Sequence, residues 1–388
     1  MLPFPIEFLF FGLTLAGVAI FHERNFEIAL GGLLLIALYK ATVLGYSLLP
    51  HLVHEAPLLI NLLGLLLGFA ILAKHFEDSR LPDLLPHWLP DDWRGGFLLL
   101  VMVAVISTFL DNIAAAMIGG VIARRVFKGH VRIGYIAAIV AASNAGGAGS
   151  VVGDTTTTMM WIAGVPALHV ADAFVASIVA VAVSGIIAAR QQHAWQPIGK
   201  DWPRDHRVDW MRLGVAGLII TGAIVANVLF EFPALGVWVA IVLGAVLRSV
   251  PWGEAVHAMK GSLFLLCLVT AASLMPVNEL PAASVQTAFG LGFVSAVFDN
   301  IPLTKLALDQ GGYDWGMLAF AVGFGGSMIW FGSSAGVAIT NEFPEAKNTG
   351  RWLREGWHVA LAYVLGFGAL YLLLGWHPDP LPGAGGHG

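Results

Sequence analysis

The chain has 388 residues, of which 57% are hydrophobic and only 12% are charged. Its mean hydropathy is +0.79. A soluble domain carries about 25% charged residues, so this composition excludes a soluble or nucleic-acid-binding protein and predicts a polytopic protein of the lipid bilayer. The first apolar run lacks a basic region and a cleavage site, so we expect a retained span. No P-loop, zinc motif or Ser–His arrangement is found, and the sequence therefore predicts neither an enzyme nor an ATP-driven pump.

Apolar runs follow one another along the chain, at about 4–21, 26–49, 57–75, 97–127, 133–165, 167–189, 210–231, 234–250, 261–275, 284–308, 314–340 and 356–376. The run 97–127 would form a helix of roughly 46 Å, too long for a hydrocarbon core of ~30 Å. It carries Asp111-Asn112 at its middle, so we predict a re-entrant hairpin folded at that pair. The run 284–308 carries Asp299-Asn300, and the same reasoning predicts a second hairpin.

Two other runs contain polar stretches that an ordinary membrane helix would not carry. Residues 143–158 include four glycines, one Asn, one Asp and four threonines. Unwound backbone survives at membrane depth only inside protein or beside a polar cavity. We therefore predict a broken helix here, and a second one in the run 314–340, where Gly325-Gly326 and Gly332-Ser333-Ser334 interrupt the apolar pattern.

The distribution of basic residues supports the two hairpins. If both runs are re-entrant, all of the 20 Lys and Arg except Lys40 and Lys305, which lie within apolar runs, fall on one side of the membrane. If both runs crossed the membrane instead, only 11 would remain on that side. The positive-inside rule favours the hairpins, and both termini are then predicted to face outward.

This topology reveals an internal repeat. Each half has three spans, a hairpin, a broken span and a closing span, and the halves enter the membrane in opposite directions. Residues 107–113 match residues 295–301, residues 144–147 correspond to 324–326, and Gly149-Ser150 corresponds to the Gly332-Ser333 region. Inverted repeats of this kind are typical of secondary transporters, whose site lies near the midplane between the repeats.

The predicted fold class is an all-α polytopic membrane protein with an inverted repeat of about five spans plus one re-entrant hairpin per half, and two broken helices. The predicted parts are first-half scaffold spans with an interfacial arm (1–95), first-half hairpin, broken helix and closing span (96–190), cytoplasmic linker (191–209), second-half scaffold spans (210–283), second-half hairpin, broken helix and closing span (284–376), and disordered tail (377–388).

Carboxylates, amides, hydroxyls and freed carbonyl groups converge on the predicted midplane. The candidate ion- and proton-binding residues are Asp111, Asn112, Asn144, Asp154, Thr155, Thr156, Thr157, Thr158, Ser295, Asp299, Asn300, Ser327, Ser333 and Ser334. Alkali cations prefer oxygen ligands, and a proton competes for a buried carboxylate. Among these we expect Asp111, Asn112, Asn144, Asp154, Asp299 and Asn300 to hold Na⁺. The alternative is that the aspartates only cap broken helix ends.

Lys305 is the one basic residue predicted near the midplane. In one interpretation its ammonium reaches along the hairpin arm to the outer surface. In the other it pairs with Asp299 when no cation is bound and is a possible proton or charge partner. His51, His54 and Glu55 are predicted to lie in a solvated outward turn, where a histidine could sense pH near neutrality.

In these motifs the sequence resembles the ion transporter superfamily, and within it the NhaD-type sodium/proton antiporters. The resemblance rests on residues 109–112, 143–147, 153–157, 295–303, 325–327 and 332–338. It covers the chain from about residue 95 to the end, with a looser match over the first three spans. It implies a scaffold and a transport domain, elevator-type movement and a homodimer. Related dicarboxylate carriers carry hairpin tips that resemble Ser-Asn-Thr, without the aspartates, and Lys305 departs from the apolar residues usual in such antiporters.

The sequence thus predicts a secondary active transporter that exchanges Na⁺ or Li⁺ for H⁺ across the bacterial inner membrane and needs no cofactor. The alternative is a sodium-coupled transporter of a small anion, such as a dicarboxylate, a tricarboxylate or an arsenite-like oxyanion. A third class, a membrane scaffold without transport, is disfavoured by the cost of midmembrane carboxylates. The preference among Na⁺, Li⁺ and K⁺ and the stoichiometry stay open at this point.

Overall fold

The computed structural model describes residues 5–21, 24–199 and 207–379, and the regular structure of these residues is entirely helical. The helices are α1 (Ile6–Ile20), α2 (Asn25–Thr42), α3 (Leu48–Asp78), α4 (Trp93–Ser107), α5 (Asn112–Val126), α6 (Ile133–Ala148), α7 (Thr155–Ile162), α8 (Ala167–Ala171), α9 (Ala173–Trp195), α10 (Trp210–Phe230), α11 (Pro233–Gly244), α12 (Trp252–Ser273), α13 (Val285–Ser295), α14 (Asn300–Gln310), α15 (Trp315–Gly325), α16 (Ser334–Glu342), α17 (Thr349–Glu355) and α18 (Trp357–Leu374). Short 3₁₀ turns are η2 (Pro82–Trp88), η3 (Val277–Glu279), η4 (Gly326–Met328) and η5 (Pro344–Lys347). The predicted all-α class is confirmed.

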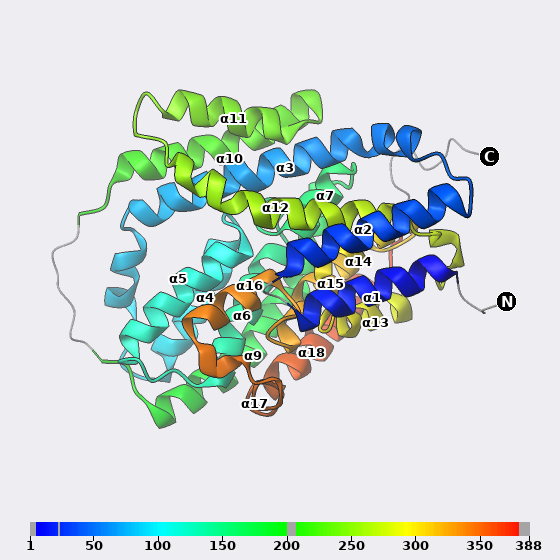
Figure 1. Cartoon of the computed structure of the whole chain (residues 1–388). Coiled ribbons are helices and arrows are strands. Elements are labelled where there is room, and N and C mark those ends of the chain that lie inside the picture. Colours follow the sequence, from blue (N-terminus) through cyan, green and yellow to red (C-terminus); the bar gives the residue numbers. More distant parts are fainter. Residues whose placement is uncertain (1–4, 22–23, 200–206, 380–388) are drawn as a thin grey trace.

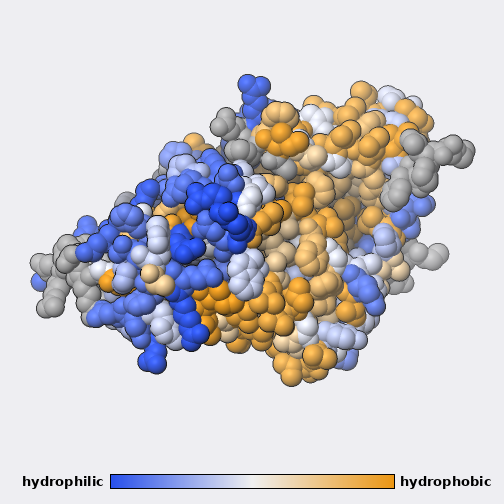
Figure 2. Space-filling view, turned by 90° about the horizontal axis from the view of Figure 1, so that it is seen from below, coloured by the Kyte–Doolittle hydropathy of each residue, from blue (hydrophilic) through white to orange (hydrophobic). Residues whose placement is uncertain are grey.

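The surface is that of a membrane protein. Six of the described helical segments are long and apolar enough to cross a membrane, and many large apolar side chains point outward from them. Figure 2 shows hydrophilic side chains gathered at one end of the molecule and a broad hydrophobic surface beside them. In water such a surface would cause the protein to associate with itself, whereas in a membrane it lies against the lipid tails. The chain is therefore a multi-pass integral membrane protein, as predicted.

Two layers of helices organise the molecule. Helices α10, α11 and α12 pack on α3, and Figure 1 shows these four helices together in the upper part of the view. Helices α4, α6, α9 and α18 lie below them and pack closely on one another. The cavity described below is lined by α3 and α12 on one side and by α5, α7 and α16 on the other.

The two long apolar runs both break at their Asp-Asn pairs. Helix α4 ends at Ser107 and α5 begins at Asn112, and the two helices run antiparallel because Gly119 lies against Val103 while Gly96 lies near Phe127. The second run breaks between α13 and α14. The Nε2 of Gln310, at the end of α14, donates to the carbonyl of Pro281 at 2.7 Å, just before α13 begins. Each run therefore turns back toward its starting point.

Glycines allow the second pair of breaks, between α6 and α7 and between α15 and α16. A Cβ added to Gly147 would press on the carbonyl of Gly153, and a Cβ on Gly326 would press on the carbonyl of Gly332. The backbone on either side of each break therefore approaches more closely than any side chain permits. This close approach explains why both breaks are glycine-rich.

The start of α3 differs from the prediction. We expected the span to begin at about residue 57 and placed His51, His54 and Glu55 in a solvated turn, but α3 begins at Leu48 and contains all three. Pro57 removes a backbone hydrogen bond, yet the helix continues through it. Glu55 is only 8% exposed, so the prediction of a solvated turn was wrong.

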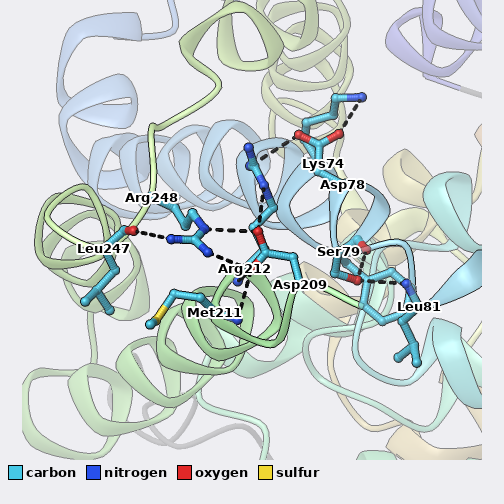
Figure 3. Close-up of polar contacts among 10 residues, drawn as sticks. Lys74, Asp78, Ser79, Leu81, Asp209, Met211, Arg212, Leu247 and Arg248 are labelled. Atoms are coloured by element: carbon cyan, nitrogen blue, oxygen red, sulfur yellow. Dashed lines mark hydrogen bonds and ion pairs between the residues drawn. The ribbon is translucent and has the colours of Figure 1, made fainter. Parts of the chain in front are cut away.

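A polar clamp fixes the end of α3 to α10 (Figure 3). The Asp209 carboxylate accepts hydrogen bonds from the backbone of Met211 and Arg212, which caps α10, and from the guanidinium of Arg248 at 3.0 and 3.1 Å. Arg212 also pairs with Asp78 at 3.3 Å, and the Asp209 N–H donates to the carbonyl of Ser79. One aspartate thus joins three chain segments at the polar end.

Two predicted connecting segments lie partly outside the described residues. Of the predicted linker 191–209, the first residues continue α9 to Trp195, and residues 200–206 lie outside the described part. Of the predicted tail 377–388, residues 380–388 lie outside it too. Before them, the His377 N–H donates to Asp314 at 2.9 Å and the Asp379 carbonyl accepts from Trp315, so this segment is attached to the start of α15.

Candidate ion site

Three predicted carboxylates, those of Asp111, Asp154 and Asp299, line one cavity of about 960 Å³. Each aspartate is the residue that precedes a helix, α5, α7 and α14 respectively. The helix breaks predicted from the sequence therefore bring three residues that are far apart in the chain to a common space.

Asp154 has the most complete set of partners. Its side chain is buried, and its Oδ1 accepts from the backbone N–H and the hydroxyl of Thr156 at 2.9 and 3.0 Å. Its Oδ2 accepts from the Nδ2 of Asn112 at 2.9 Å. Asp154 thus caps α7, as the alternative interpretation predicted, but a cap needs only Oδ1. The second oxygen faces the amides of the site.

A chain of amide hydrogen bonds continues from Asp154 into the second half of the protein. The Nδ2 of Asn112 also donates to the Oδ1 of Asn144 at 3.0 Å, and the Nδ2 of Asn144 donates to Ser327 at 2.9 Å and to Ser333 at 3.1 Å. Asn144, Ser327 and Ser333 are almost fully buried. A buried network with all its members satisfied is rigid and geometrically specific.

The second hairpin contributes a less elaborate group. Asp299 caps α14 through a bond from the Ile301 N–H at 3.0 Å. Asn300 is buried beside it, and its carbonyl accepts from the Thr304 hydroxyl at 2.9 Å. The structure places Asp299 on the cavity wall together with Ser334.

Several predicted hydroxyl ligands instead hold the backbone together. The hydroxyl of Ser295 donates to the carbonyl of Val322 at 2.7 Å, and that of Thr157 donates to the carbonyl of Ser150 at 2.6 Å. Thr158 donates in the same way to Val151 at 2.9 Å but also lines the cavity, as does Thr155. Ser295 therefore attaches the second hairpin to α15, and Thr157 attaches the start of α7 to the backbone of the break before it.

Lys305 contradicts the predicted pairing with Asp299. Its ammonium lies 2.9 Å from Glu55 on α3 and 2.7 Å from Asp309 on α14. The Lys305 side chain is only 5% exposed, so it does not reach the outer surface either. The sequence did not reveal Glu55 as the partner because the two residues lie on separate helices and no local pattern connects them.

The cavity reaches the polar end of the molecule, where Lys74 and Glu77 are 30% and 62% exposed and mark its mouth. Its walls there include Lys74, Glu77, Arg125, Glu254 and His257, which belong to the last turns of α3 and α5 and the first turn or two of α12. These residues were not singled out from the sequence, because they gather only when three helices meet. All basic residues among the described lining lie at this mouth, and none of them lies beside the three aspartates.

Comparison with known proteins identifies the family. The profile of the family described as citrate transporter matches residues 18–325, well over half of the chain. The chain belongs to this family. Relatives include sodium/proton antiporter 1 of Arabidopsis thaliana, 27% identical over 70% of this chain and 52% of the relative, and the Na(+)/H(+) antiporter NhaD of Vibrio parahaemolyticus, 28% identical over 76% of this chain and 88% of the relative. The Na(+)/H(+) antiporter NhaD of Halomonas elongata is 25% identical over 74% of this chain and 70% of the relative.

These relatives confirm the resemblance to NhaD-type antiporters that the motifs predicted. The chain spans about half the length of the first plant relative. The family and its named relatives are transporters, which agrees with the prediction that the protein is not an enzyme.

Proposed function

We propose that the protein exchanges Na⁺ or Li⁺ for H⁺ through the cavity lined by Asp111, Asp154 and Asp299. The observation that carries the proposal is the convergence of these three carboxylates on one space whose basic lining residues all lie at its mouth. Carboxylates removed from water need a cation or a proton to offset their charge. A site that must hold one or the other exchanges them.

The ligands available suit an alkali cation. Around Asp154 the site offers the Oδ2 of Asp154 and the Oδ1 of Asn144, and each accepts one described bond and so keeps a further lone pair. Hard cations prefer such oxygen ligands. The Nδ2 of Asn112 now lies between Asp154 and Asn144, and we infer that the cation takes its place. The names of the Arabidopsis, Halomonas and Vibrio relatives support sodium as the cation.

We also propose that the two antiparallel pairs are re-entrant hairpins within an inverted repeat. Equivalent contacts recur in both halves: the Ser107 hydroxyl bonds the Ser143 carbonyl as Ser295 bonds Val322. A Cβ on Gly146 would press on the Ala104 carbonyl, and one on Gly325 would press on that of Gly292. These correspondences support the repeat. They pair Gly153-Asp154, rather than Gly149-Ser150, with Gly332-Ser333, since Asp154 and Ser333 both cap helices.

The polar end with the clamp and the cavity mouth is proposed to be cytoplasmic, because basic residues of the described chain gather there, among them Lys74, Arg125, Arg212 and Arg248. The structure then corresponds to a state open to the inside. The same reasoning, with the bacterial NhaD relatives, supports a place in the bacterial inner membrane. A homodimer stays a prediction of the family resemblance.

Sodium-coupled anion transport is the second candidate. The family is described as citrate transporter, and four helix N-termini, those of α5, α7, α14 and α16, carry the aspartates and Ser333. Helix N-termini favour anions. In this chain, however, three of those four ends are already occupied by carboxylates, which oppose a second anion.

Everted membrane vesicles separate the two candidates. A preset pH gradient should collapse on addition of NaCl or LiCl, and citrate should not increase the response. Uptake of labelled citrate that requires sodium, without dissipation of the pH gradient by sodium alone, would replace exchange by anion symport. Vesicles from cells that express Asp154→Asn are the matched control.

A further inference from the structure

Lys305, Glu55 and Asp309 form a charged cluster that the proposed exchange does not use. Lys305 on α14 is 4% exposed and Glu55 on α3 is 8% exposed. The Lys305 ammonium lies 2.9 Å from Glu55 and 2.7 Å from Asp309. Charges this deeply buried are stable only while paired, so each of the two bonds is expected to matter.

The two bonds have different geometries. Asp309 lies one turn after Lys305 on the same helix, so their pairing is local and moves with α14. Glu55 lies on α3, which packs with α10, α11 and α12. The Lys305–Glu55 bond therefore joins the upper group of helices to a hairpin helix below it (Figure 1).

This bond lies beyond the cavity-lining residues of α3, on the side away from the mouth. The cavity wall on α3 runs from Leu62 to Glu77, and Glu55 precedes Leu62 by two turns, or about 10 Å along the helix. On α14, Lys305 lies about 9 Å beyond Asp299 along the helix axis. Other polar contacts accumulate at the same end, where His51 bonds Tyr46 at 3.1 Å and Ser273 at 2.9 Å.

We propose that the Lys305–Glu55 ion pair is the outer gate of the transport pathway. It closes the end of the cavity opposite the mouth, and it must separate for the site to reach the outer solution. Lys305 keeps Asp309 as its partner when the gate opens, so the ammonium is not left alone in a buried place. This proposal rests on the proposed transport function and adds the residues that control access from outside.

The test measures access to the cavity from each side and requires no transport. In a Cys267→Ser background, a cysteine replaces Leu66, which is partly exposed in the cavity wall. Membrane-impermeant thiol reagents are applied to right-side-out and to inside-out vesicles. In the parent, we expect labelling from the inside and little from the outside.

Glu55→Gln removes the charge on α3 but leaves Lys305 paired with Asp309. We expect it to raise the rate of outside labelling by about tenfold, since a hydrogen bond between charged groups is stronger than one to a neutral group. Asp309→Asn is the matched control, because it removes the local partner and keeps the bond across the helices. It should leave outside labelling unchanged.

A charge exchange, Glu55→Lys with Lys305→Glu, preserves the bond in reverse and should restore the parent pattern, whereas Glu55→Lys alone should raise outside labelling. The proposal is overturned if outside labelling is unchanged in Glu55→Gln, or if Asp309→Asn increases it equally. Failure of the parent to exchange Na⁺ for H⁺ would reject the proposed function instead, independently of the labelling result.

Discussion

Substitution of Asp154 by Asn tests the ion site most directly, because it removes one negative charge and keeps the size and shape of the side chain. The carboxylate now accepts bonds on both oxygens, from Thr156 on Oδ1 and from Asn112 on Oδ2. An amide has only one oxygen, so in either orientation its NH₂ group would face an existing donor. A buried donor without an acceptor costs about 1–3 kcal/mol, and loss of a charged interaction costs about 1.5–3 kcal/mol.

The buried donor destabilises the ion-free protein, whereas the loss of the charged interaction, about 1.5–3 kcal/mol, corresponds to a roughly 10- to 100-fold weaker apparent affinity for Na⁺ at about 1.4 kcal/mol per tenfold. The substitution also removes a carboxylate that can carry the exchanged proton, so sodium-driven dissipation of a pH gradient in everted vesicles should disappear. Thr156→Val keeps the charge and loses one neutral donor, so its affinity should fall by no more than about tenfold. Exchange with parental affinity in Asp154→Asn would refute the assignment of Asp154.

Three further outcomes are expected. Cysteines at Arg94 and Lys128, in the Cys267→Ser background, should both label only from the cytoplasmic side, and labelling from opposite sides would exclude the first hairpin. Gly146→Ala should lower the free energy of unfolding in detergent by about 1–3 kcal/mol, because its Cβ meets the Ala104 carbonyl, whereas Gly217→Ala, with open space around it, should not. The bond from Arg248 holds the pKa of Asp209 below its usual range, so the clamp stabilises the protein above about pH 4 and loses this contribution in stronger acid. Thermal unfolding of the parent and of Asp209→Asn should therefore converge as the pH falls below that value.

The helix breaks and the carboxylates could be predicted from the sequence because hydrocarbon tolerates so few alternatives. An Asp-Asn pair in the middle of an overlong apolar run requires a break or a polar partner, and both Asp111 and Asp299 lie at such breaks. The same argument identified the region from Ser143 to Thr158, where α6 ends and α7 begins.

Features that depend on contact between distant helices could not be predicted in this way. Glu55 was assigned to a turn because it precedes the apolar run that starts at about residue 57, and its pairing with Lys305 depends on how α3 lies against α14. The hydroxyl of Ser295 looked like an ion ligand, but it donates to a backbone carbonyl. Residue type shows what a group is able to bind, and only the surrounding structure determines which partner it takes.

The corresponding breaks of the two halves differ in a way that bears on the chemistry. The break after α6 supplies Asp154 and follows Asn144, whereas the break after α15 supplies Ser333 and Ser327. These two serines accept both N–H bonds of the Asn144 amide, which turns its oxygen toward the Nδ2 of Asn112. At these two breaks, therefore, one half supplies a carboxylate and an amide, and the other half supplies the hydroxyls that orient the amide. A cation that binds beside Asp154 must disturb bonds that reach into both halves, and this gives the ion a direct physical connection to the arrangement of the two halves.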